Sequence, residues 1–264
     1  MHRRKFLAAS LAASAAALAP AQQSQAQQDH MTTARDFYLL RRYTMQTGPQ
    51  TALVEKYLSE ALIPALTRRN LGPIGAFRLE VGPETPAFYV LVPTRTTGQA
   101  AMLDQDLATD ADYVKAADAF WSAPATAPAF LRTDSQLLIS FEGWPKITPP
   151  AKAARRIFQL RTYESPSHHA HEVKVKMFHA GEFEIFKAAG FHPVFFGDTL
   201  IGPRQPNLTY MLASEDQATL EAQWNTFRND PNWKKLSADP KYAYEPIVSN
   251  ITNLYLSPLA ASQI

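Results

Sequence analysis

Two stretches of this chain match each other at a constant spacing of 120 residues. Arg41 corresponds to Arg161 and Tyr43 to Tyr163, and each pair follows a strand-like apolar run. The same shift carries the apolar run 88–92 onto a similar run in the second half. Several matches at one spacing and in one order are typical of a duplicated unit that packs against its own copy.

Each half is predicted to run strand, helix, strand, strand, helix, strand, because β-branched and aromatic runs alternate with helical periodicity. This is the order of a ferredoxin-like βαββαβ unit, whose antiparallel sheet has one face without helices. The expected fold class is therefore α+β, with two tandem ferredoxin-like units whose sheets face each other as an α/β barrel. The expected strands are 36–45, 74–81, 87–93, 134–142, 156–163, 192–202, 207–213 and 246–256, and the expected helices are 50–70, 98–121, 168–189 and 215–229.

A proline-rich stretch separates the two halves. Pro145, Pro149 and Pro150 interrupt any regular pattern there, which predicts a linker at 144–155. The first ferredoxin-like domain is then expected at 35–143 and the second at 156–264.

The first 28 residues have the order of an export signal. Arg3 and Arg4 precede an alanine-rich apolar run, and small-x-small cleavage sites follow at 19–21 and 24–26. Segment 1–28 thus resembles a twin-arginine signal peptide, and its apolar run is too short to span a bilayer. We expect a periplasmic or secreted protein, and no other run is long enough for integral membrane association.

The charge balance gives no reason to expect a nucleic-acid partner. There are 26 Lys and Arg against 24 Asp and Glu, and without Arg3, Arg4 and Lys5 the balance is 23 against 24, or −1. The absence of cysteine excludes disulfides, thiolate metal sites and cysteine nucleophiles. Phosphate-binding glycine loops and G-x-S-x-G motifs are also missing, so no cofactor is expected.

The second half resembles a known family through several blocks in order. It is similar to bacterial NIPSNAP-domain proteins over roughly residues 156–264, whereas the first half matches only in outline. The resemblance implies a dimeric α/β-barrel fold, and hence a homodimer as one expectation; it implies no assigned chemistry. The blocks are Lys174–Phe178, Gly181–Phe186, Pro193–Gly197, Gly202–Leu212, Asp230–Trp233, Ile247–Leu254 and Ser262–Ile264.

The strand that opens the second half carries the candidate ligand-binding residues. Alternation places Gln159, Arg161 and Tyr163 on one face and the apolar residues of the strand on the other. We expect the polar face to point into the barrel, with Arg41 and Tyr43 as partners from the first half. An enclosed guanidinium beside a phenol suits a carboxylate or an enolate. The alternative is that these side chains pair with neighbouring acids and only stabilise the sheet register.

Other polar clusters are weaker candidates. His168 and His171 have the helical spacing of two metal ligands, but an exposed helix start favours solvated histidines, so no metal site is expected. His171 is also the candidate axial ligand if haem is bound. Glu182 and Glu184 flank a phenylalanine and are interpreted as a solvated helix face. Trp224 is interpreted as a core residue.

Three functions are considered for this sequence. The first is an exported binding protein for a small apolar or carboxylated molecule. The second is a cofactor-independent monooxygenase or isomerase of the α/β-barrel type, in which Arg161 and Tyr163 stabilise an anion. Haem-dependent chemistry is the third. Other barrels of the superfamily that the resemblance implies include cofactor-free monooxygenases, haem enzymes and small-molecule isomerases, so the fold alone does not choose among these functions.

Overall fold

The computed structural model describes residues 34–152 and 156–264. The predicted export signal at 1–28 lies outside the described residues. Part of the predicted linker at 144–155 does so too, and its described residues form no helix or strand. Both regions, and the division into two domains, therefore remain predictions.

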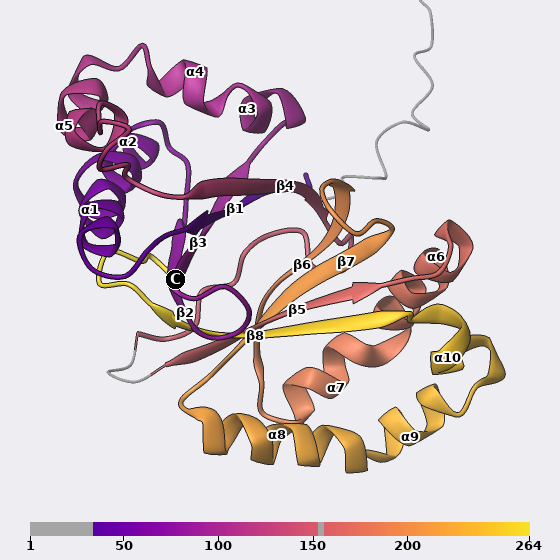
Figure 1. Cartoon of the computed structure of the whole chain (residues 1–264). Helices are drawn as coiled ribbons and strands as arrows, with labels where there is room; N and C mark the ends of the chain where they lie inside the picture. Colours follow the sequence, from indigo (N-terminus) through magenta and orange to yellow (C-terminus); the bar gives the residue numbers. More distant parts are fainter. Residues whose placement is uncertain (1–33, 153–155) are drawn as a thin grey trace, which may run out of the picture. The chain divides into compact units, whose positions relative to one another are not determined.

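Eight antiparallel strands form a closed barrel in the described part of the chain (Figure 1). The order around the barrel is β1, β3, β2, β8, β5, β7, β6 and β4, and β4 pairs with β1 to close it. The expected α/β barrel is thus confirmed. The strands are β1 (Phe37–Thr44), β2 (Gly75–Val81), β3 (Ala87–Thr94), β4 (Arg132–Ser140), β5 (Ile157–Glu164), β6 (His192–Ile201), β7 (Asn207–Ser214) and β8 (Asn250–Pro258).

The two halves of the chain contribute one block of four strands each. Within each block the order is fourth, first, third and second strand of that half. The blocks join edge to edge, because β2 pairs with β8 and β4 pairs with β6. The halves therefore form one continuous sheet.

The inside of the barrel is apolar. Tyr38, Phe77, Phe158, Phe195 and Met211 belong to one buried cluster that draws on strands of both halves. An eight-stranded barrel is just wide enough for such side chains to fill its interior. The core that joins the two halves is consequently a packed, largely apolar interior.

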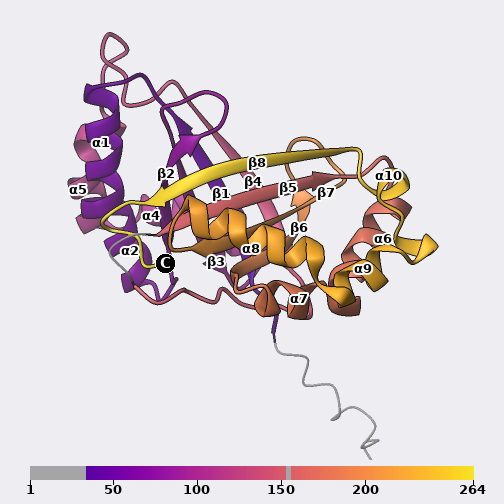
Figure 2. The same ribbon diagram turned by 90° about the horizontal axis from the view of Figure 1, so that it is seen from below.

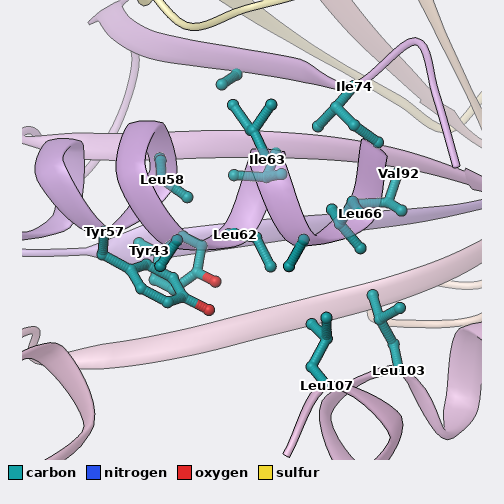
Figure 3. Packing of buried hydrophobic residues seen from close by; sticks show 14 of the residues in the cluster. Tyr43, Tyr57, Leu58, Leu62, Ile63, Leu66, Ile74, Val92, Leu103 and Leu107 are labelled. Atoms are coloured by element: carbon teal, nitrogen blue, oxygen red, sulfur yellow. The ribbon is translucent and has the colours of Figure 1, made fainter. Parts of the chain in front are cut away.

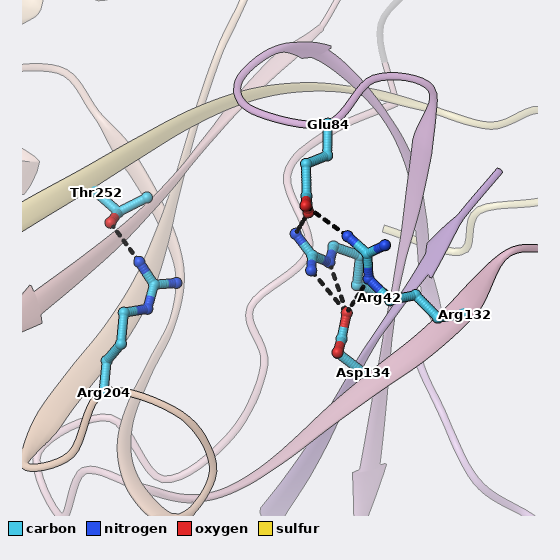
Figure 4. A network of polar contacts seen from close by, with 6 residues as sticks. All are labelled: Arg42, Glu84, Arg132, Asp134, Arg204 and Thr252. Carbon is cyan, nitrogen blue, oxygen red and sulfur yellow. Dashed lines mark hydrogen bonds and ion pairs between the residues drawn. The ribbon is translucent and has the colours of Figure 1, made fainter. Parts of the chain in front are cut away.

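A group of ion pairs lies near the C-terminal end of β1. Arg42 follows Leu40 at the spacing that keeps both on the interior face. Its guanidinium contacts Glu84 at 2.8 Å and Asp134 at 2.7 Å, and Arg132 pairs with the same two acids (Figure 4). The charges in this group are internally compensated.

Helices cover the outside of the barrel, in one layer for each half (Figure 2). The helix expected at 98–121 is three shorter helices, because Met102 and Asp110 each interrupt it. The elements are α1 (Pro49–Tyr57), the π-helical turn η2 (Leu58–Leu62), α2 (Ile63–Arg68), α3 (Thr97–Ala101), α4 (Leu103–Leu107), α5 (Ala111–Trp121), α6 (His168–Met177), the π-helical turn η3 (Phe178–Glu182), α7 (Phe183–Ala188), α8 (Gln217–Asn229), α9 (Pro231–Ser237), the 3-10 turn η4 (Pro240–Tyr242) and α10 (Tyr244–Ile247).

The expected direction of the polar face of β5 is wrong. Phe158 and Leu160 point into the barrel, while Tyr163 packs with the aromatic residues of the helical layer. Gln159 and Arg161 lie on the same outward face of β5 as Tyr163, and both contact Trp224 of α8. The physical reason is that the interior around Phe158 and Leu160 is filled by apolar side chains that offer no partners for a guanidinium, whereas the gap under the helices holds phenols, indoles and an opening to solvent.

Candidate functional site

A cleft of about 560 Å³ lies between the outer face of β5 and β8 and the helical layer of the second half. Three of the five predicted site residues, Gln159, Arg161 and Tyr163, form part of its wall. The remaining lining residues are Lys174, Glu182, Glu221, Trp224, Phe227, Arg228, Trp233, Tyr244, Ile251, Asn253 and Tyr255.

Arg161 is held by aromatic side chains. Its guanidinium carbon lies 4.4 Å from the centroid of the Trp224 ring, and one Nη donates a hydrogen bond of 2.9 Å to the Tyr163 hydroxyl. The Tyr163 hydroxyl is in turn 2.9 Å from that of Tyr210. Stacking on an indole covers the face of a guanidinium and leaves its edge donors available.

The edge of Arg161 is not fully used. Its Nε is buried and has no hydrogen-bond partner, and within the described residues no carboxylate lies within 4.0 Å of the guanidinium. Burial by itself lowers the pKa of Arg161, but the phenol groups of Tyr210 and Tyr163 more than offset this, and the pKa stays above its ordinary value. Arg161 is therefore a partly buried cation without an acidic partner, which is costly unless something compensates it.

Gln159 orients the indole that covers Arg161. Its side-chain oxygen accepts a 2.7 Å hydrogen bond from Nε1 of Trp224, and its amide nitrogen is 3.5 Å from the Tyr255 hydroxyl. Gln159 therefore links the floor of the cleft to α8.

A buried ion pair lies beside the cleft. Nζ of Lys174 is 2.9 Å from the Glu182 carboxylate, and these side chains are 4% and 2% exposed. Lys174 also lies 5.3 Å from the ring centroid of Tyr163. The interpretation of Glu182 as a solvated residue is wrong, because the π-helical turn η3 rotates its side chain inward, while Glu184 is exposed as expected.

Arg41 and Tyr43 do not join this cleft. They lie on the outer face of β1, under the helices of the first half. Both Nη atoms of Arg41 donate 2.9 Å hydrogen bonds to Asp104 of α4. Tyr43 packs among aromatic rings, including Tyr57 at 6.3 Å between centroids (Figure 3). The first-half arginine is therefore neutralised within the protein.

The two candidate histidines are not brought together with further ligands. The interpretation of His171 as solvated is wrong, because its ring is buried and its Nε2 lies 2.7 Å from Asp198, whereas His168 is exposed at the start of α6 as expected. Neither lines the Arg161 cleft. In residues 34–152 and 156–264, no group of three or more His, Asp or Glu side chains is arranged to hold a metal ion.

Trp224, Lys174, Glu182 and Tyr210 contribute to the site but were not predicted to do so. Trp224 lies at helical spacing with the apolar residues of α8, and the sequence alone therefore indicates a core residue. A comparison of the two halves at the shift of 120 residues would have singled out the other three, because Val54, Leu62 and Val90 stand at the corresponding positions.

Comparisons with known proteins agree with this fold. The NIPSNAP family model matches residues 158–263. A protein from Lactobacillus acidophilus provisionally named a monooxygenase has a similar structure, with 11% identity, 85% of this chain and 94% of that chain covered, and a TM-score of 0.56. A counterpart from Fusobacterium nucleatum, also provisionally named a monooxygenase, shows 9% identity, coverage of 86% and 94%, and a TM-score of 0.51.

A further similar structure is that of an anthrone oxidase-like protein, with 8% identity, coverage of 86% and 92%, and a TM-score of 0.50. At these identities the similarity establishes the fold and no more. No curated protein matches the sequence. In the part of the chain that the structure describes, no helix is both long and apolar enough to cross a membrane.

Proposed function

We propose that the chain binds a small, largely aromatic or apolar molecule carrying one anionic oxygen group in the cleft beside Arg161. The observation that carries this proposal is the state of Arg161 itself. It is a partly buried cation with an unpartnered Nε and no acid within ion-pair distance in the described residues. A bound anion at the Nη edge would supply the missing counter-charge.

The contrast between the two halves supports the choice of the second half. The corresponding cation Arg41 already has its acid in Asp104. Around Arg161, four buried polar residues stand where the first half has buried apolar residues. Buried polar groups cost stability, so their concentration beside one cleft favours a functional role. The replacements, first half to second, are Leu39 to Gln159, Val54 to Lys174, Leu62 to Glu182 and Val90 to Tyr210.

The lining of the cleft indicates the chemistry of the ligand. Trp224, Phe227, Trp233 and Tyr244 provide aromatic surface. Three cations and two carboxylates line the cleft, which leaves one positive charge in excess. An aromatic or apolar body with a single negative charge matches both features.

The test is the binding of 2-naphthoate and of its neutral analogue 2-naphthalenemethanol, followed by calorimetry. Arg161→Gln should weaken the binding of 2-naphthoate by about 10-fold or more, because a charge-assisted hydrogen bond is worth roughly 1.5–3 kcal/mol. Binding of the neutral alcohol should change little. Arg161→Lys should restore part of the preference for the anion.

Arg228→Gln is the matched control, since Arg228 is an exposed cation on the rim of the same cleft. We expect less than about a 3-fold effect from it, because solvent screens exposed charges. The proposal is wrong if Arg161→Gln, folded by circular dichroism, binds 2-naphthoate as tightly as the unmodified protein.

A second candidate function uses the same donors. The chain of hydrogen bonds from Arg161 through Tyr163 to Tyr210 could stabilise an enolate or phenolate, as a cofactor-independent monooxygenase or isomerase requires. One of the similar structures is named anthrone oxidase-like. Anthrone with O2 gives anthraquinone and water, so oxygen uptake with anthrone tests this candidate. Uptake no faster than in buffer would speak against oxidation of this substrate class.

We also propose that the two halves arose by duplication. The strand order within each block supports this, as do the π-helical turns η2 and η3, whose bounds differ by 120 residues. Glu84 and Arg204, again 120 residues apart, have φ angles of 60° and 59°. A separately determined single-half relative with a different strand order would weaken this proposal.

Export remains a proposal that rests on Arg3, Arg4 and the apolar run that follows them. Cell fractionation tests it, since a protein found only in full length in the cytosol would contradict it.

A further inference from the structure

We infer that the ligand's anionic group is a carboxylate, or an equivalent planar pair of oxygens, held by the edge of Arg161 as Asp104 is held by Arg41. This inference rests on the proposed function and specifies the ligand class for the same cleft. It begins from one position that differs between the two halves.

Asp104 and Trp224 occupy corresponding positions. They are 120 residues apart, and so are Thr96 and Asp216, the residues that cap the preceding helix starts. The caps act alike, because Thr96 accepts from the amide of Gln99 and Asp216 from that of Thr219. Residues 104 and 224 therefore lie equally far along the chain from these caps, although Met102 interrupts the first-half helix and α8 is continuous.

Each of the two residues contacts the arginine of its own half. Asp104 accepts hydrogen bonds from both Nη atoms of Arg41 at 2.9 Å. The guanidinium carbon of Arg161 lies over the Trp224 ring, 4.4 Å from its centroid. An acid at this position accepts hydrogen bonds from the Nη edge of the guanidinium, whereas an indole offers no acceptor there.

The first half therefore contains a built-in model of the bound state. Asp104 provides two coplanar oxygens to the guanidinium of Arg41. Arg41 on β1 and Arg161 on β5 occupy equivalent positions in the pairing with β3 and β7, and a tyrosine follows two residues later in both halves. In the second half, among the residues that the structure describes, no acid lies within ion-pair distance of Arg161, and the cleft reaches it instead. A ligand carboxylate in that cleft would restore the bidentate pair that Asp104 makes with Arg41.

The geometry of Trp224 keeps this edge available. Its indole is fixed by the hydrogen bond to Gln159 and by ring contacts with Phe186, Phe191 and Phe227. The ring is thus held beside the guanidinium without accepting a hydrogen bond from it.

The experiment moves the acid of the first half into the second. Trp224→Asp should place a carboxylate beside Arg161 and compete with the ligand from within the protein. Trp224→Asn removes the same ring without adding the charge, and Trp224→Phe keeps an aromatic ring. We expect 2-naphthoate to bind at least about 10-fold more weakly to Trp224→Asp than to Trp224→Asn, because one ion pair with a guanidinium is replaced by another.

A measurement without substitution protects the test against poor folding of these variants. In the unmodified protein, 100 mM acetate should weaken the binding of 2-naphthoate several-fold more than 100 mM chloride does. Acetate presents two coplanar oxygens to the guanidinium and chloride presents none. The ionic strength is equal in both solutions, so general screening cancels.

The inference is overturned if Trp224→Asp and Trp224→Asn bind 2-naphthoate equally, or if acetate and chloride compete equally. Should Arg161→Gln still abolish binding in that case, anion binding in the cleft stands and only the bidentate carboxylate is rejected. Should Arg161→Gln also have no effect, the proposed function fails as well.

Discussion

At the scale of single residues, the two halves differ most in how they treat buried charge. The second half buries Lys174 against Glu182, while the first half has Val54 and Leu62 at those positions. Such a pair adds little stability, because the loss of hydration offsets most of the attraction. Its presence beside the cleft therefore points to a role in shaping the site.

A double replacement measures this balance. Lys174→Val together with Glu182→Leu should leave the free energy of unfolding unchanged or raise it by about 1–4 kcal/mol. Glu182→Leu alone should lower it by about 3–5 kcal/mol, because Lys174 then stays buried without a partner. Urea denaturation gives these values. Removal of the exposed pair of Lys56 and Glu60 is the control and should change stability by less than about 0.5 kcal/mol. A single variant as stable as the double one would refute this account.

At the scale of secondary-structure elements, the helical layers show how local geometry positions the site. The π-helical turn η3 contains Gly181 at φ 154° and turns Glu182 toward the cleft. Helical periodicity in the sequence predicted one continuous helix here, because a single extra residue in a turn does not interrupt the apolar pattern.

Gly181→Ala tests the backbone requirement at this turn. The nearest atom to an added Cβ is Leu236 Cδ2 at 4.0 Å, so space is available and the cost would come from the φ angle. We expect a loss of about 1–3 kcal/mol in urea denaturation. Gly98→Ala in α3 meets nothing closer than 3.9 Å and has no positive φ, so it should be stabilised by about 0.4–1 kcal/mol. Equal effects of the two substitutions would argue against a conformational role for Gly181.

At the scale of the whole barrel, one core serves both halves. Phe158 of β5 packs against Phe77 of β2 with 4.9 Å between ring centroids, and Tyr38 packs against Phe195 at 5.3 Å. Contacts of this kind link unfolding of one half to unfolding of the other.

Phe158→Ala should therefore weaken both halves together. We expect a loss of about 3–5 kcal/mol in a single urea transition, with hydrogen exchange accelerated in β1–β4 as well as in β5–β8. Val81→Ala, at an exposed position of β2, should change stability by less than about 0.5 kcal/mol. Two separate transitions, or faster exchange in the second half alone, would show that the halves fold independently.

From its sequence alone, this chain could be assigned its strands, its alternating strand faces, its α/β-barrel class and the grouping of Gln159, Arg161 and Tyr163. Alternation along a strand determines which side chains share a face, and that depends only on local geometry. The sequence could not show whether the face with Arg161 points into or out of the barrel, because both faces of a barrel strand are buried and their apolar content is similar. Only the closed barrel decided that Phe158 points inward and Arg161 outward. The acid that neutralises Arg41 comes from a helix 63 residues away. That none of the described acids lies beside Arg161, where Trp224 packs instead, is seen only in the tertiary structure. Charge compensation depends on distances in space between segments that are far apart in the chain.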